Sequence, residues 1–136
     1  MEHVDRVHGS CLCGKVRFQA RLPSRWCAHC HCSRCRKAHG AGYVTWAGFP
    51  EDAFELTSDP ETLEWYRSSP EAERAFCHQC GSSLLFRSTR WPGEIHVAVG
   101  ALDDPLDRAP QAHVHHDDHV DWVVIDDALA VYGRDG

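Results

Sequence analysis

The spacing of the cysteines constrains this chain more than any other feature of its sequence. The eight cysteines fall into three short clusters: Cys11 and Cys13; Cys27, Cys30, Cys32 and Cys35; Cys77 and Cys80. Cysteines separated by one or two residues are typical of metal sites, because their sulfurs can reach one ion. A zinc ion with four protein ligands is structural, whereas one with three keeps a position for water or substrate. The number of ligands in each cluster therefore bears directly on function.

A disulfide framework is the competing explanation for so many cysteines in 136 residues. The first residues, Met1 to Arg6, are polar and lead into no apolar run of the kind found in secretory leaders. No apolar stretch is long enough to span a bilayer, so no membrane partner is expected. Thiols that remain available for zinc fit a reducing compartment, and we expect a cytoplasmic protein.

The formal charge of −6 argues against a nucleic-acid partner. Zinc binding would make the charge more negative by roughly 3, if four cysteine thiolates bind one Zn²⁺ and three bind another. Nucleic-acid binding requires a basic face, so a DNA- or RNA-binding zinc finger is disfavoured.

Short β-prone runs predict a mainly β protein. Apolar and polar residues alternate over 15–22, as in a half-buried strand. Other short strands are expected at 43–46, 63–66, 75–76, 83–86 and 95–99. One helix is expected, from Ser33 as N-cap to His39, with Gly40 at its end. Residues 121–129 fit either a helix or a strand. Without a linker or repeat, residues 1–136 are predicted to form a single zinc-binding domain.

The first and third clusters are predicted to form one closed site. In a strand, Cys11 and Cys13 would share a face and present both sulfurs to one ion. A turn at Cys77 and Cys80 would bring backbone N–H groups to the sulfurs, and Gly81 tolerates the positive φ of such turns. Four sulfurs complete a tetrahedral zinc site that contributes stability. The alternative is that the four cysteines are buried free thiols. That alternative does not explain why they are spaced like metal ligands.

The middle cluster is predicted to offer three sulfurs. Cys30 and Cys32 share a face if a strand runs into them, and Cys35 joins them through a turn into the helix. Cys27 is an odd number of residues from both and would face the other way. A second zinc on Cys30, Cys32 and Cys35 then has an open position. A bend at Cys27 would instead close a structural site of four sulfurs.

Basic residues and histidines surround the middle cluster. Three basic residues would offset its negative charge and attract an anionic ligand: Arg34, Arg36 and Lys37. The candidates for a proton carrier are His29, His31, His39 and His113. Of these, His31 is disfavoured, because the neighbours of Cys30 and Cys32 in a strand point away from the metal. The polar run from His113 to Asp121 is predicted to be a solvated loop.

The large aromatic and remaining basic side chains are assigned more general roles. The tryptophans are expected in the core or in the walls of a pocket: Trp26, Trp46, Trp65, Trp91 and Trp122. Three arginines are expected to form surface ion pairs, with the carboxylates of a peptide-like ligand as the alternative partners: Arg67, Arg74 and Arg87.

Three segments resemble the glutathione-dependent formaldehyde-activating enzyme family, which is also called the centromere protein V domain family. The segments are Gly9–Gly14, Cys30–Ala41 and Phe76–Leu84, with further similarity at Val99–Pro105, His113–His115 and Trp122. The resemblance covers nearly the whole chain and implies a β-tent fold of short antiparallel strands. It also implies a structural zinc on Cys11, Cys13, Cys77 and Cys80, and a reactive zinc on Cys30, Cys32 and Cys35.

The resemblance further implies a carbon–sulfur lyase that acts on an adduct of the S-hydroxymethylglutathione type. The expected partner is a small thiol or thiol–aldehyde adduct, with glutathione as a candidate. The chemistry suits an open zinc site, which holds a thiol as the nucleophilic thiolate and polarises an aldehyde oxygen. The competing hypothesis is a non-catalytic binding module with two structural zinc sites. The number of ligands at the second site distinguishes the two hypotheses.

Overall fold

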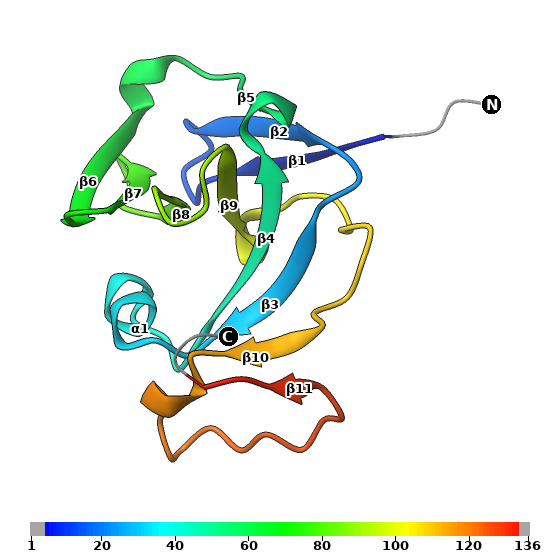
Figure 1. Cartoon of the computed structure of the whole chain (residues 1–136). Helices are drawn as coiled ribbons and strands as arrows, with labels where there is room; N and C mark the ends of the chain where they lie inside the picture. Colours follow the sequence, from blue (N-terminus) through cyan, green and yellow to red (C-terminus); the bar gives the residue numbers. More distant parts are fainter. Residues whose placement is uncertain (1–4, 134–136) are drawn as a thin grey trace.

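The computed structural model describes residues 5–133, which fold mainly into β-strands (Figure 1). Within these residues lie one α-helix, α1 (Ser33–His39), and short 3₁₀ turns. The strands are β1 (Arg6–Ser10), β2 (Arg17–Arg21), β3 (Trp26–Cys30), β4 (Val44–Pro50), β5 (Phe54–Leu56), β6 (Leu63–Ser69), β7 (Ala72–Cys77), β8 (Ser83–Ser88), β9 (Glu94–Ala98), β10 (Ala112–Val114) and β11 (Ala130–Val131). The predicted mainly β class, with a short helix after the second cysteine cluster, is confirmed.

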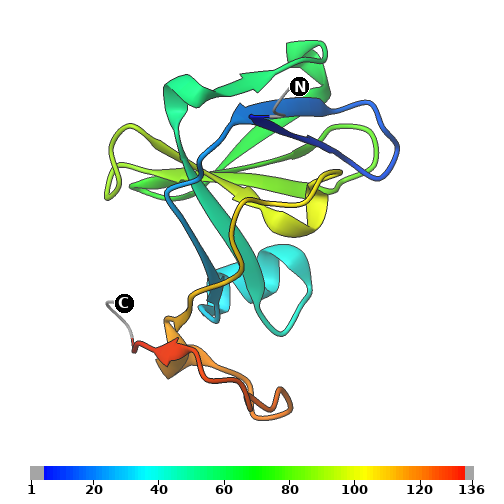
Figure 2. The ribbon, with the colours of Figure 1, turned by 90° about the vertical axis from the view of Figure 1, so that its right-hand side faces the viewer.

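The strands form two sheets, one small and one large. The small sheet has the order β1-β2-β5, and the large sheet has the order β11-β10-β3-β4-β9-β8-β7-β6. Most neighbours are antiparallel as expected, but β10 runs parallel to both β3 and β11. Strand β4 extends from the region of β2 and β5 down to α1 and β3 (Figure 1). Viewed from the side, the orange and red C-terminal segment lies below the strands of the small sheet (Figure 2).

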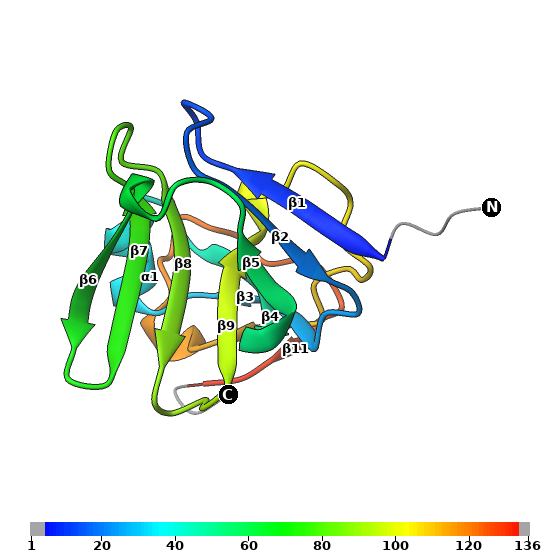
Figure 3. The same cartoon turned by 90° about the horizontal axis from the view of Figure 1, so that it is seen from above.

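The main core lies between the small sheet and the β4–β9–β8–β7 part of the large one. Alternate residues of β1 and β2 face inward, and Val7 and Phe18 are at most 1% exposed. They belong to one buried cluster with Phe49, Leu84 and Val97 of the large sheet. Burial of each such side chain is worth about 1.5–3 kcal/mol. Seen from above, β6 to β9 lie side by side with the small sheet crossing beside them (Figure 3).

A second, smaller apolar cluster joins the large sheet to α1. It contains Cys30, Cys35, Val44, Trp46 and Ala98. These residues come from β3, α1, β4 and β9. The cluster therefore fixes the second group of cysteines against the face of the large sheet.

The ends of α1 show both agreement with the sequence prediction and a difference from it. The helix spans the predicted residues and ends at Gly40, whose φ of 61° is the left-handed conformation that glycine adopts easily. The N-cap is Cys32, whose sulfur accepts the N–H of Cys35, so the prediction of Ser33 was wrong. No helix within residues 5–133 is both long and apolar enough to span a membrane.

The remaining elements differ from the predictions mainly in length. The strand expected at 15–22 is β2, and the run expected at 43–46 continues to Pro50 in β4. Residues 121–129 form neither a helix nor a strand, and β11 begins only at Ala130. Short strands such as β1 and β5 were not predicted. Their own sequences are too short to carry a clear alternating pattern of apolar and polar residues, and they are stabilised by hydrogen bonds to β2.

Gly48 leaves the space that the Trp26 indole occupies, which gives a test of the fold. Gly48 on β4 pairs with Trp26 on β3 and with His96 on β9. A Cβ atom at Gly48 would lie 2.3 Å from Trp26 Nε1. We expect Gly48→Ala to lower the free energy of unfolding by about 1–3 kcal/mol, measured by denaturant unfolding. Gly100→Ala is the control, because its added Cβ meets no heavy atom within 4 Å. Equal losses in both variants would contradict this packing.

Candidate metal centres and the adjoining cavities

The first and third cysteine clusters meet in space, 64 residues apart in sequence. The sulfurs of Cys11, Cys13, Cys77 and Cys80 all lie within 4.8 Å of one another. The Sγ atoms of Cys11 and Cys13 are 3.6 Å apart, and those of Cys13 and Cys77 are 3.7 Å apart. Four sulfurs at the corners of a tetrahedral zinc site would be separated by about 3.8 Å. The group therefore fits a zinc ion, and we call it the four-sulfur centre.

Turns rather than a strand bring these sulfurs together. Cys11 and Cys13 follow the end of β1, so the expectation that both lie in one strand was wrong. The predicted glycine conformation is confirmed at Gly81, with a φ of 80°. The N–H groups of Gln79 and Cys80 each donate to the sulfur of Cys77 at 3.3 Å. These two hydrogen bonds fix the Cys77 sulfur in the turn, next to the other three sulfurs.

A second group of sulfurs forms where β3 passes into α1. The sulfurs of Cys30, Cys32 and Cys35 lie within 4.8 Å of one another, and we call this group the three-sulfur centre. β3 ends at Cys30, so the start of the helix, rather than one strand face, turns Cys32 and Cys35 toward it. Hydrogen bonds from Cys30 and Cys35 lower the pKa of the Cys32 thiol, and hydrogen bonding to Cys32 in turn raises the pKa of Cys30. One sulfur of the group thus carries negative charge readily, as metal binding requires.

Cys27 does not join the three-sulfur centre. It borders the same space but lies outside the converging sulfurs of the described residues. Its side chain is 1% exposed, and burial raises the pKa of its thiol to about 11. The amide oxygen of Gln111 accepts the backbone N–H of Cys27. The side chain is therefore a small, neutral, buried group at this position.

The three-sulfur centre faces a cavity of about 390 Å³. We call it the aromatic cavity, because its walls include Trp26, Trp46, Phe86, Trp91 and His96.

Three of the five tryptophans thus form the predicted pocket wall. Trp65 instead packs against the main core beneath Arg87, whose guanidinium lies 3.9 Å from the ring centre. Trp122 is 69% exposed, so its assignment to the core or to a pocket was wrong.

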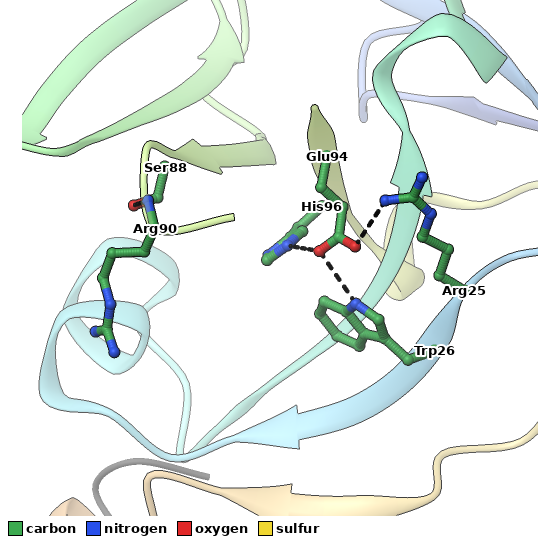
Figure 4. A network of polar contacts seen from close by, with 6 residues as sticks. All are labelled: Arg25, Trp26, Ser88, Arg90, Glu94 and His96. Carbon is green, nitrogen blue, oxygen red and sulfur yellow. Dashed lines mark hydrogen bonds and ion pairs between the residues drawn. The ribbon is translucent and has the colours of Figure 1, made fainter. Parts of the chain in front are cut away.

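The carboxylate of Glu94 holds two walls of the aromatic cavity in place (Figure 4). It accepts hydrogen bonds from His96 Nε2 at 2.8 Å and from Trp26 Nε1 at 3.2 Å. Arg25 adds a weaker ion pair at 3.3 Å. The hydrogen bond from His96 is the main reason that the pKa of Glu94 is lowered. The sequence analysis missed this pair because the strand predicted at 95–99 leaves out Glu94, whereas β9 includes both residues and places them on one face.

The predicted proton carriers lie outside the aromatic cavity. His113 belongs to β10 and is 2% exposed, so the solvated-loop prediction was wrong there. Its Nδ1 lies 2.9 Å from His31 Nε2, and its Nε2 lies 3.0 Å from Asp127. His31 is fully buried, and this burial lowers the pKa of its imidazole to about 4. As predicted, His31 points away from the sulfurs, toward the rings of Tyr43 and His113.

Different histidines reach the cavity. Among the described residues, those that line it are His96 and His115, neither of which was predicted. His115 directly follows β10 and has a φ of 53°. A positive φ is uncommon for a residue other than glycine, and such residues are often found near functional sites. No local pattern in the sequence marks this conformation.

Arginines line a second cavity of about 280 Å³ beside the first. We call it the arginine cavity, because Arg34, Arg74 and Arg90 all border it. Within residues 5–133 none of the three forms an ion pair with a carboxylate, although Glu71 and Asp118 also line the cavity. Cys32 borders both cavities, so the three-sulfur centre lies where they meet.

The predicted ion pairs of the arginines are only partly present. Arg67 and Arg87 both bind Glu73, at 3.4 and 2.9 Å. Arg74 instead directs its two terminal nitrogens at the sulfur of Cys35, each at 3.7 Å. It therefore places positive charge beside the three-sulfur centre rather than on a surface carboxylate.

Comparison with known proteins identifies the class. The model of the glutathione-dependent formaldehyde-activating enzyme family matches residues 6–118, so the chain belongs to this family. A protein of Halomonas elongata is 33% identical over 88% of this chain and 81% of its own length, and it carries the provisional name of glutathione-dependent formaldehyde-activating enzyme. An uncharacterized lyase of Schizosaccharomyces pombe is 35% identical over 63% of this chain and 61% of its own length.

A solved structure supports the fold. A crystal structure of a Rhodobacter sphaeroides protein aligns with a TM-score of 0.62 and 25% identity. The alignment covers 74% of this chain and 91% of that chain. The aligned part of the chain thus shares its fold with a protein of experimentally determined structure.

Comparison of Cys77→Ser with Cys32→Ser tests the roles of the two centres. Cys77→Ser should release zinc from the four-sulfur centre and unfold much of the chain, because metal binding there is coupled to folding. Cys32→Ser should keep the fold and lose about one zinc ion per chain, because its centre joins residues close in sequence. Metal analysis and far-UV circular dichroism measure both effects. Equal unfolding in the two variants would show that both centres are structural.

Cys27→Ala tests whether the second centre has three sulfurs or four. Because Cys27 lies outside the centre, the variant should retain the zinc content of the parent. The expected loss of stability is that of a small buried side chain, about 1 kcal/mol. Zinc analysis and thermal unfolding give the two values. Loss of one zinc ion would indicate a closed four-sulfur site and contradict the assignment.

Proposed function

We propose that the protein is a zinc-dependent carbon–sulfur lyase that forms and cleaves the adduct of a small anionic thiol and an aldehyde, of the S-hydroxymethylglutathione type. The observation that carries the proposal is the three-sulfur centre at the junction of two cavities. A purely structural centre needs no cavity, whereas an enzyme needs space for a ligand next to the reactive group.

The ligands of the two zinc ions follow from the sulfur groups. Cys11, Cys13, Cys77 and Cys80 would hold the structural ion, and Cys30, Cys32 and Cys35 would hold the second. Sets of thiolates select zinc over harder metals such as magnesium and calcium. When bound at a site with an open position, zinc keeps a thiol in its thiolate form and polarises a carbonyl oxygen.

The reaction requires few changes in bonding. In the direction of synthesis, the thiol loses its proton, its sulfur bonds to the carbonyl carbon, and the carbonyl oxygen gains a proton. Cleavage reverses each change and releases thiol and aldehyde. The aromatic cavity shields the reacting atoms from bulk water, and Arg74 beside Cys35 offsets negative charge at the sulfurs.

The arginine cavity supports an anionic thiol as the partner. A chain with a formal charge of −6 repels anions over most of its surface. Arg34, Arg74 and Arg90 oppose this locally, next to the sulfurs, and outnumber the two carboxylates of the same cavity, Glu71 and Asp118. Guanidinium groups bind carboxylates through paired hydrogen bonds, and glutathione is a thiol that carries two carboxylates. The eight free cysteines fit a reducing compartment, and we place the protein in the cytoplasm.

The binding-module hypothesis would require a closed second centre. Within residues 5–133 no fourth cysteine, histidine or carboxylate converges on Cys30, Cys32 and Cys35. The open fourth position therefore favours the enzyme over the binding module.

Exchange between glutathione and its formaldehyde adduct tests the function. We expect the zinc-loaded protein to accelerate this exchange, followed by two-dimensional NMR exchange spectroscopy. Arg90→Gln should raise KM by about tenfold with little change in kcat, because it removes one carboxylate contact. Arg67→Gln is the matched control, since Arg67 lies outside the arginine cavity and pairs with Glu73. No acceleration by the parent, or equal effects of the two variants, would contradict the proposal.

A further inference from the structure

We propose that the aldehyde-derived part of the natural adduct is an apolar group of aromatic size, bound in the aromatic cavity. This inference rests on the proposed function and extends it from the thiol to the other half of the ligand. It follows from the different chemistry of the two cavities, which meet at Cys32 and share Arg74, Phe86, Trp91 and His115 as a common wall.

The position of the three-sulfur centre assigns one half of the adduct to each cavity. The sulfur of the ligand must lie near Cys30, Cys32 and Cys35, where the two cavities meet. The anionic thiol extends toward the guanidinium groups of the arginine cavity, because charge complementarity places it there. The group joined to the sulfur from the aldehyde then enters the aromatic cavity.

The aromatic cavity is larger than a hydroxymethyl group requires. Its volume is about 390 Å³, whereas a carbon and an oxygen occupy only a few tens of Å³. Its walls combine the rings of Trp26, Trp46, Phe86 and Trp91 with the small side chains of Ala28 and Ala112. Polar side chains also line the cavity, namely Arg74, His96, Gln111 and His115, but most of its walls are apolar. Apolar walls favour an apolar occupant.

Contacts within the chain hold the walls of the aromatic cavity in place. The Glu94 carboxylate fixes Trp26 and His96 by hydrogen bonds, and it is only 11% exposed (Figure 4). The His96 ring is packed by its neighbours, with ring centres 4.6 Å from Trp26 and 5.4 Å from both Phe86 and Trp91. Because these hydrogen bonds already fix the positions of the aromatic side chains, less conformational entropy is lost when a ligand binds.

Binding of unreactive adduct mimics tests the inference. Isothermal titration of the zinc-loaded full chain should compare glutathione, S-methylglutathione and S-benzylglutathione. The thioether carbon of each mimic stands for the aldehyde-derived carbon of the adduct. We expect S-benzylglutathione to bind at least about tenfold more tightly than S-methylglutathione, because its ring is removed from water in the aromatic cavity.

A pair of alanine variants locates the binding of the ring. Ala112→Leu places a larger side chain in the cavity wall and should weaken the binding of S-benzylglutathione more than that of S-methylglutathione, which abolishes the advantage of the benzyl group. Ala130→Leu is the matched control, because Ala130 pairs with Ala112 across β10 and β11 but is exposed and lies outside the cavity. Trp91→Ala, which removes one wall, should also reduce the advantage. Zinc content and near-UV circular dichroism verify that each variant is folded.

The outcomes separate this inference from the proposed function. Equal affinities of the two mimics in the parent, or equal effects of Ala112→Leu and Ala130→Leu, would overturn the inference alone while glutathione still binds. Failure of all three glutathione compounds to bind would reject the anionic-thiol function and this inference with it. A benzyl advantage that Ala112→Leu removes and Ala130→Leu keeps would support both.

Discussion

The rest of the structure depends on the convergence of four sulfurs from two turns. Cys11 and Cys13 follow β1, whereas Cys77 and Cys80 lie at the end of β7. The four-sulfur centre thus ties the small sheet to the far half of the large sheet, and the main apolar core lies between them. A metal bound by these four sulfurs would add a strong, directed cross-link between the two sheets. The positions of β7, β8 and β9, which carry the cavity walls, follow from this connection.

The three-sulfur centre has a different structural basis. Its cysteines lie within six consecutive residues, Cys30 to Cys35, so binding a metal there closes only a short loop. The apolar cluster of Val44, Trp46 and Ala98 holds these residues against the large sheet without a metal. The fold can therefore tolerate exchange of a ligand at this centre. On the proposed function, stability and reactivity would be separated between two sulfur groups of similar chemistry.

The parts of the structure that local spacing determines were predictable from the sequence. Both sulfur groups, α1 and the alternating strand β2 have short-range signals, and the structure contains all of them. Two errors were local, the N-cap at Ser33 and the strand expected at Cys11 and Cys13, but others concern features that depend on distant partners. His113 looked like part of a solvated loop, but it is buried because β10 adds to the edge of β3. Glu94 and Trp26, 68 residues apart, form a wall that no local pattern reveals.

The buried charge at Glu94 shows how the fold and the ligand site are linked. A carboxylate this far from water is costly unless it is fully hydrogen-bonded, and here three side chains from β3 and β9, or next to β3, bind it. An apolar residue at this position would pack with less cost but would leave the Trp26 and His96 nitrogens without an acceptor. The network is therefore better explained by the shape of the aromatic cavity than by stability alone. On this view the family scaffold fixes the sulfurs, and the residues at the ends of β3 and β9 determine which adduct fits beside them.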